Sequence, residues 1–145
     1  MLVSHLTQET RSRFRTLDER RSVREAARAF ADSQLGLLIV CTDTGEASGV
    51  VSKSDLVRHL ATSGSAEAPL AEVMSRAVVF ASPASDLRQT WHLMVERRLQ
   101  NLPLLGAAGR PVGTLDIRDA LEAILGNEER QERELINYIA GNGYR

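Results

Sequence analysis

Two copies of one short motif contain the residue types that could bind a ligand. The first copy is residues 49–55, Gly-Val-Val-Ser-Lys-Ser-Asp, and the second is residues 113–119, Gly-Thr-Leu-Asp-Ile-Arg-Asp. A helix N-terminus offers free N–H groups to a phosphate, the Ser52 hydroxyl adds a donor, and the Asp55 carboxylate can accept both hydroxyls of a ribose. Gly49 would let a ligand approach the backbone closely. A nucleoside phosphate would satisfy all of these groups.

The same residues also fit a structural role. Ser52 and Asp55 match a capping box, in which the serine accepts a helix N–H and the acid three residues later sits favourably on the helix dipole. Asp116 can cap the second helix in the same way. Residue chemistry alone leaves both interpretations open.

The two copies differ where Ser52 is replaced by Asp116. A carboxylate at this point repels a phosphate unless a cation or an arginine lies nearby. We therefore expect the second site to prefer an uncharged nucleoside end, to hold a metal-bridged phosphate through Asp116, or to be empty. Asp116 and Asp119 are too few ligands to predict a metal site by themselves.

Both motifs belong to an internal repeat. Residues 14–60 align with residues 78–124 at a constant offset of 64 without a gap. A single duplication of this length predicts two similar units related by a pseudo-twofold axis, with equivalent clefts between them. The identical pairs are Arg24/Arg88, Leu35/Leu99, Leu38/Leu102, Gly45/Gly109, Gly49/Gly113 and Asp55/Asp119.

Each unit has the pattern strand, helix, strand, strand, helix. Apolar helical stripes begin at Val23 and Leu87, with Ser22 and Asp86 placed to cap them. Apolar runs too short for helices, glycine turns and a second helical stripe follow in both units. The fold class is therefore α+β, two β-α-β-β-α units packed through small mixed sheets. The predicted strands are 15–17, 37–41 and 49–51, then 78–80, 102–105 and 112–115, with final helices at 56–61 and 120–125. The strand at 15–17 is less clear than the one at 78–80.

The sequence divides into three parts. Residues 1–64 hold an N-terminal segment and the first unit, residues 65–127 hold a linker and the second unit, and residues 128–145 form a tail. The tail is predicted to continue the last helix and to stop at the glycines of residues 141–143. Its apolar side chains could pack on the chain's own lobes or on a second subunit, and the sequence does not choose between them.

Bulk composition excludes some partners. The chain has 145 residues, a net charge of −1 and a pI near 6.3, so no overall field favours nucleic acid or an anionic membrane. Arginines concentrate in residues 11–28, which is either a solvated face or a phosphate-binding lip. Lys53 is the only lysine. A single cysteine, Cys41, in an apolar run predicts a small buried side chain, and we expect a soluble cytoplasmic protein.

Catalysis is not predicted. The candidate groups are His5, His59, His92 and Cys41, which show no spacing typical of a metal site or a nucleophile with its base. We expect a non-catalytic protein with no covalent cofactor.

At this point the pattern resembles a tandem cystathionine-β-synthase (CBS) domain pair, or Bateman module, of the stand-alone bacterial type. The resemblance covers about residues 14–126. It depends on the order of elements, on the linker at residues 70–80, on Asn-Leu-Pro-Leu-Leu at residues 101–105, and on Gly-h-h-Ser-x-x-Asp, where h is apolar.

The resemblance implies adenosine-containing ligands, such as AMP, ADP, ATP or NAD, in clefts between the repeats of a flat homodimer. It assigns phosphate contact to Ser52, beside Lys53, and ribose contact to Asp55, with Asp119 as the ribose residue of the second cleft. Asp116 departs from the family's Ser or Thr. Residues implied around the adenine are Thr16, Leu17 and Leu38, or Phe80, Ala81, Leu102 and Pro103.

The predicted function is a regulatory, signal-transducing module that binds an adenosine nucleotide and acts in trans on an effector protein. The alternatives are a ligand-free homodimerisation scaffold and a sensor of S-adenosylmethionine or a metal-nucleotide.

Overall fold

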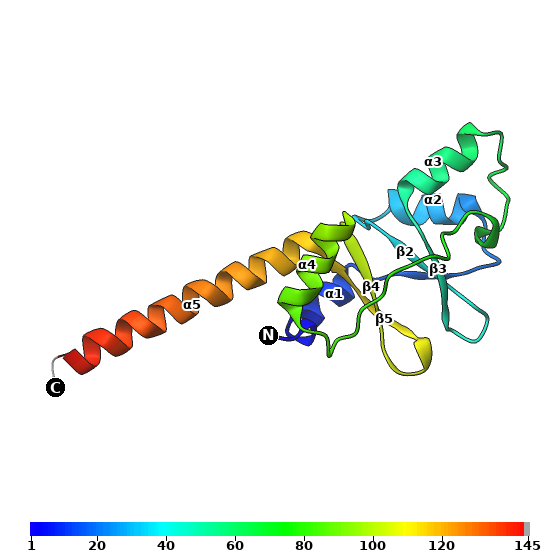
Figure 1. Ribbon diagram of the computed structural model, residues 1–145. Helices are drawn as coiled ribbons and strands as arrows, with labels where there is room; N and C mark the ends of the chain where they lie inside the picture. Colours follow the sequence, from blue (N-terminus) through cyan, green and yellow to red (C-terminus); the bar gives the residue numbers. More distant parts are fainter. Residues whose placement is uncertain (144–145) are drawn as a thin grey trace.

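The computed structural model describes residues 1–143 and shows two lobes followed by a long projecting helix (Figure 1). The α+β fold class is confirmed. The elements in chain order are η1 (Val3–Leu6), α1 (Thr7–Ser12), β1 (Thr16–Asp18), α2 (Val23–Ala31), β2 (Leu38–Cys41), β3 (Ala47–Val51), α3 (Lys53–Ala61), η2 (Leu70–Glu72), α4 (Leu87–Arg97), β4 (Asn101–Leu105), η3 (Ala107–Gly109), β5 (Pro111–Asp116) and α5 (Ile117–Gly143).

The first lobe is built on a three-stranded sheet in the order β1-β2-β3. Strand β1 is parallel to β2, and β2 is antiparallel to β3. The predicted cap of α2 is confirmed, because the Ser22 side chain accepts a hydrogen bond from the Glu25 N–H. All four residues of β2 are buried, Cys41 among them, and burial raises the pKa of the Cys41 thiol. The predicted entering strand at residues 15–17 forms as β1.

The second lobe is built on the antiparallel pair β4 and β5. The strand predicted at residues 78–80 is wrong, because only an isolated parallel bridge forms, between Ala81 and Leu104. Ser82 and Ser85 close a turn directly after Ala81, since the Ser85 N–H donates to the Ser82 carbonyl oxygen. Pro83 inside this turn lacks an N–H. The chain therefore leaves the sheet after one paired residue.

Each lobe is completed by the segment that precedes the other lobe. In the second lobe, Val3 and Leu6 of the N-terminal segment are buried with Leu87 and Met94. In the first lobe, the linker residues Leu70 and Met74 belong to the core. Leu6 and Leu70 are separated by the repeat offset of 64, so the duplication extends upstream of residue 14.

Helix α5 runs without interruption from Ile117 to Gly143 and projects away from both lobes (Figure 1). The apolar side chains of the tail do not pack on the lobes, because Leu135, Ile136 and Ile139 are 59%, 56% and 62% exposed. The last helical residue among those described is Gly143, which lies within the glycines of residues 141–143 where the helix is predicted to stop. The last two residues of the predicted tail, 144 and 145, lie outside the described residues. Among residues 1–143, no helix is both long and apolar enough to span a membrane.

Candidate functional site

Two adjoining cavities lie between the lobes. One has a volume of about 550 Å³ and the other about 650 Å³, within the range of small-molecule sites. Both are lined by residues from each lobe, and five residues line both cavities: Leu35, Gly36, Lys53, Gln100 and Asn101. The lobes are in close contact here, because a Cβ on Gly36 would collide with the Asn101 amide. A ligand in either cavity would contact both repeats.

The first motif places the start of α3 at the larger cavity. Strand β3 ends at Val51 and α3 begins at Lys53, so only Ser52 separates strand from helix. Ser52, Lys53 and Ser54 line this cavity. Among the described residues that line it, none is acidic, and Arg98 adds a second cationic side chain.

The predicted capping box is present at Ser52 and Asp55. The Ser52 Oγ accepts from the Asp55 N–H at 3.2 Å, and Asp55 Oδ2 accepts from the Ser52 N–H at 2.8 Å. The other oxygen, Asp55 Oδ1, lies 3.5 Å from the exposed Arg58 guanidinium. In the described structure the Ser52 hydroxyl acts as an acceptor, which leaves its proton for another group.

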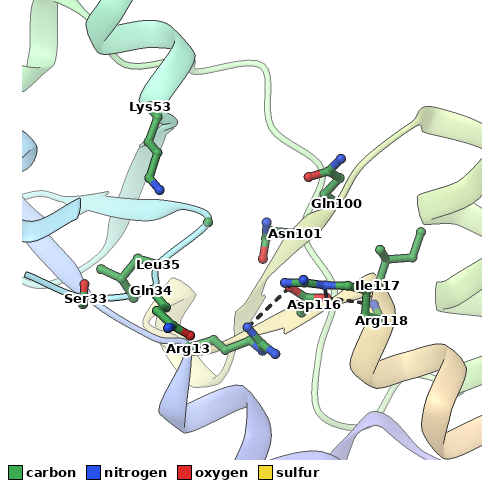
Figure 2. Close-up of a pocket in the computed structure, with 11 residues that line it drawn as sticks. Arg13, Ser33, Gln34, Leu35, Lys53, Gln100, Asn101, Asp116, Ile117 and Arg118 are labelled. Atoms are coloured by element: carbon green, nitrogen blue, oxygen red, sulfur yellow. Dashed lines mark hydrogen bonds and ion pairs between the residues drawn. The ribbon is translucent and has the colours of Figure 1, made fainter. Parts of the chain in front are cut away.

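The second motif differs because two arginines surround Asp116 (Figure 2). Asp116 is 3% exposed, and its Oδ1 accepts from the Arg118 backbone N–H at 2.8 Å and from Arg118 Nε at 3.1 Å. Its Oδ2 accepts from Arg118 Nη2 at 2.9 Å and lies 3.5 Å from Arg13 Nη1. Burial opposes ionisation, but the hydrogen bonds from Arg118 and the charges of Arg13 and Arg118 outweigh it, so the pKa of Asp116 lies below its ordinary value.

Asp119 is held by Arg13, from the end of α1. Arg13 Nε donates to Asp119 Oδ2 at 2.5 Å, and Arg13 Nη2 donates to Asp119 Oδ1 at 3.2 Å. These bonds raise the pKa of the Arg13 guanidinium. The charges of Arg13 and Arg118 cancel those of Asp116 and Asp119, so the carboxylate expected to repel a phosphate is neutralised by arginines. The described residues contain no cluster of three or more His, Cys, Asp or Glu that could hold a metal.

The residues implied around the adenine do not line these two cavities. Leu38 and Leu102 are fully buried in separate lobe cores. Thr16 and Leu17 line another cavity, of about 490 Å³, together with Arg110 of the second lobe. In the second lobe the Ala81 N–H donates to the Pro103 carbonyl oxygen at 3.1 Å, Pro103 is buried, and Phe80 is half-buried.

The space beside each motif glycine, Gly49 and Gly113, is filled by another segment of the chain and not by a ligand. A Cβ on Gly49 would lie 2.7 Å from the Ser75 carbonyl oxygen, and one on Gly113 would lie 3.0 Å from Thr10 Oγ1. The expectation that Gly49 leaves room for a ligand is wrong, because the linker fills that space. Thr10 is 4% exposed, so α1 sits closely on β5.

Sequence reasoning missed Arg13, Gln100 and Asn101 as cleft residues. The arginine-rich stretch at residues 11–28 contained Arg13, but seven arginines in that stretch gave no reason to choose it. The choice depends on α1 packing against the second lobe, which local patterns do not show. The three histidines do not line either cleft cavity: His59 bonds the Ser65 carbonyl oxygen, and His92 packs edge-on against Trp91.

The chain is therefore a tandem-repeat protein, with two matched α+β units that exchange segments and share a central cleft. A family model described as "CBS domain" matches twice, at residues 3–62 and 70–126. The chain therefore belongs to the CBS domain family and is a tandem CBS pair.

Several solved structures have the same fold. A putative acetoin utilization protein (AcuB) from Vibrio cholerae is 22% identical with a TM-score of 0.77, over 92% of this chain and 96% of that one. The CBS domain pair of protein MJ0100, in complex with 5-methylthioadenosine and S-adenosyl-L-methionine, is 19% identical with a TM-score of 0.73, over 88% of this chain and 98% of that one. The cytosolic domain of the Mg²⁺ channel MgtE, in complex with ATP, is 25% identical with a TM-score of 0.65, over 77% of this chain and 45% of that one. Tandem CBS pairs are generally regulatory and bind nucleotides or S-adenosylmethionine.

Proposed function

We propose that this CBS pair binds a phosphorylated adenosine nucleotide of the AMP, ADP, ATP or NAD class between its lobes and signals to a partner protein. The observation that carries the proposal is the position of the α3 N-terminus. Ser52 and Lys53 open onto a cavity of about 650 Å³ whose opposite wall, Leu99 to Asn101, belongs to the second lobe. A ligand bound there favours one arrangement of the lobes, and a partner can read that arrangement.

The larger cavity is the first cleft of this proposal, and the residues at the start of α3 have distinct roles there. The Ser52 hydroxyl donates to a phosphate oxygen, and the free N–H groups at the start of α3 attract the same anion. Lys53 supplies a positive charge. Asp55 does not line the cavity in the described structure, and its Oδ1 accepts a ribose hydroxyl in place of its 3.5 Å contact with Arg58, which is an exposed and weak ion pair.

The charge of the cleft favours a phosphorylated ligand. In the smaller cavity Arg13 and Arg118 are paired with carboxylates, whereas the larger cavity is lined by Lys53 and Arg98 and by no acidic residue among those described. S-adenosylmethionine carries a sulfonium cation, which these side chains would repel. The ATP complex of the MgtE domain, whose sequence is 25% identical, supports the nucleotide class.

We also propose a homodimer as the working form. Helix α3 exposes Val57 and Leu60 at 65% and 47%, and α5 exposes Leu125 and Leu135 at 50% and 59%. Large apolar side chains exposed in this way are typical of association surfaces. Light scattering coupled to gel filtration should give twice the chain mass of 15.9 kDa, and a monomer at all concentrations would contradict the dimer.

A thermal-shift panel tests the nucleotide proposal. With AMP, ADP, ATP, NAD or S-adenosylmethionine at one hundred times its Kd, stabilisation is ~2.7 kcal/mol, or about 9 °C for a chain of this length. Adenosine nucleotides should raise the melting temperature. If all five compounds leave it unchanged at millimolar concentration, the motifs only cap helices and the protein is a ligand-free scaffold.

Lys53→Gln tests where the nucleotide sits. The variant should weaken ATP binding about fivefold, corresponding to ~1 kcal/mol, and should leave adenosine binding unchanged. Arg97→Gln is the matched control, because Arg97 is an exposed cation on α4 that does not line either cleft cavity. Equal losses in both variants would indicate only a general charge effect.

A further inference from the structure

We propose that the Arg13 guanidinium is a built-in occupant of the second cleft, which is the cavity of about 550 Å³ that Arg13 lines together with Asp116 and Arg118. This guanidinium takes both oxygens of Asp119, so a nucleoside gains this carboxylate only when Arg13 withdraws. The proposal rests on the function above and on Asp119 as the ribose residue of the second cleft, the role that the CBS resemblance implies for it. Asp119 itself does not line either cleft cavity in the described structure.

The two motif aspartates are not held in the same way. Both oxygens of Asp119 accept from one guanidinium, at 2.5 and 3.2 Å, and the two side chains are only 16% and 28% exposed. Two parallel donors from one arginine make a strong and directional pair. Asp55 instead bonds its own helix start and lies 3.5 Å from Arg58, which is 73% exposed. A ribose could displace Arg58 far more easily than Arg13.

Packing fixes the position of Arg13. It directly follows α1, whose Thr10 lies against Gly113 of β5. Upstream, Val3 and Leu6 are 1% and 7% exposed in the second-lobe core. Because these contacts anchor the segment of residues 3–13, the Arg13 guanidinium is held over Asp119. Withdrawal requires movement of this segment or rotation of the Arg13 side chain.

The internal repeat shows that this occupant is specific to one cleft. At the offset of 64, the linker covers the first lobe as the N-terminal segment covers the second, and Met74 corresponds to Thr10. The residue that corresponds to Arg13 is Ala77, which is exposed and has no side chain able to reach Asp55. The first cleft has no equivalent occupant, so the two clefts should fill at different nucleotide concentrations.

The occupant also couples the second cleft to the N-terminal segment. A ligand that competes with Arg13 for Asp119 removes one of the contacts that hold residues 3–13 on the second lobe, and by linkage anything that draws this segment away increases affinity for the ligand by the same factor. The second cleft would then report high nucleotide concentration through release of the N-terminal segment.

Isothermal titration with AMP tests this assignment. Wild type should bind one AMP per chain tightly. In Arg13→Gln the affinity for a second AMP molecule should be at least about tenfold higher than in wild type, equivalent to ~1.4 kcal/mol. The double variant Arg13→Gln/Asp119→Asn should lose this gain. Arg15→Gln is the matched control, because Arg15 is an exposed arginine two residues away.

A reverse variant makes the test independent of any loss of stability in Arg13→Gln. Ala77→Arg places an arginine over the first cleft and should weaken the tight AMP site about tenfold. If Arg13→Gln does not change the affinity for the second AMP molecule while wild type still binds AMP, the proposal that Arg13 occupies the second cleft is wrong and the proposed function stands. If AMP binds neither wild type nor Arg13→Gln, both the proposed function and the proposed role of Arg13 are wrong.

Discussion

Asp116→Asn should destabilise the protein at neutral pH and have little effect in acid. Asp116 is 3% exposed and accepts three hydrogen bonds from Arg118. Loss of a buried partner typically costs 3–5 kcal/mol, but Arg118 is 77% exposed and can return to water. We therefore expect a loss of about 2 kcal/mol in the free energy of unfolding, or about 7 °C in melting temperature.

The pH dependence follows from the direction of the pKa shift. Folding lowers the pKa of Asp116, so ionised Asp116 stabilises the folded state at any pH above the ordinary carboxyl value of about 4. This stabilisation is lost as pH falls through the lower pKa of the folded state. Asparagine does not titrate, so the difference between wild type and variant should shrink toward zero over that range.

Urea denaturation of both proteins between pH 7 and pH 2 measures this difference. Asp43→Asn, at an exposed position, is the matched control and should cost less than ~0.5 kcal/mol. Equal stability of Asp116→Asn and wild type at pH 7, or a deficit that stays constant into acid, would refute the view that Asp116 is held ionised by its arginines.

Three smaller substitutions test the packing. Thr114→Val should stabilise the protein by ~1 kcal/mol in urea denaturation, because the buried Thr114 hydroxyl has no hydrogen-bond partner in the described structure. The equivalent residue of the first repeat is already a valine, Val50. A loss of stability would mean that an unseen partner exists. Gly49→Ala should cost ~2 kcal/mol, because its Cβ would lie 2.7 Å from the Ser75 carbonyl oxygen, and a neutral effect would show that the linker moves freely. Gly126→Ala, inside α5 with no atom within 4 Å of its Cβ, should instead raise the melting temperature through a gain of ~0.8 kcal/mol, and no gain would indicate that this helix is frayed there.

The repeat made most of the lobes predictable. Residues whose structure depends on neighbours a few positions away followed local rules, as in the N-cap at Ser22 and the capping box at Ser52. The strand at residues 78–80 failed because the turn at Ser82 and Pro83 takes the chain away from β4. Apolar content alone does not show whether a short run stays beside a partner strand.

The exchanged segments and the Arg13 contact could not be predicted in the same way. Arg13 and Asp119 are 106 residues apart in the chain, and they meet only because Val3 and Leu6 pack in the second lobe. The sequence did indicate that Asp116 would repel a phosphate unless an arginine or a cation lay nearby. It could not indicate which of the many arginines supplies it.

Nuclear magnetic resonance of ¹⁵N-labelled protein during a titration with AMP tests the central claim most directly. Backbone amides of residues 52–54, at the start of α3, and of residues 99–101, which lead into β4, should shift together with one dissociation constant, because both segments line the same cavity. Shifts confined to one lobe, or no shifts at millimolar AMP, would contradict a nucleotide site shared between the two CBS repeats.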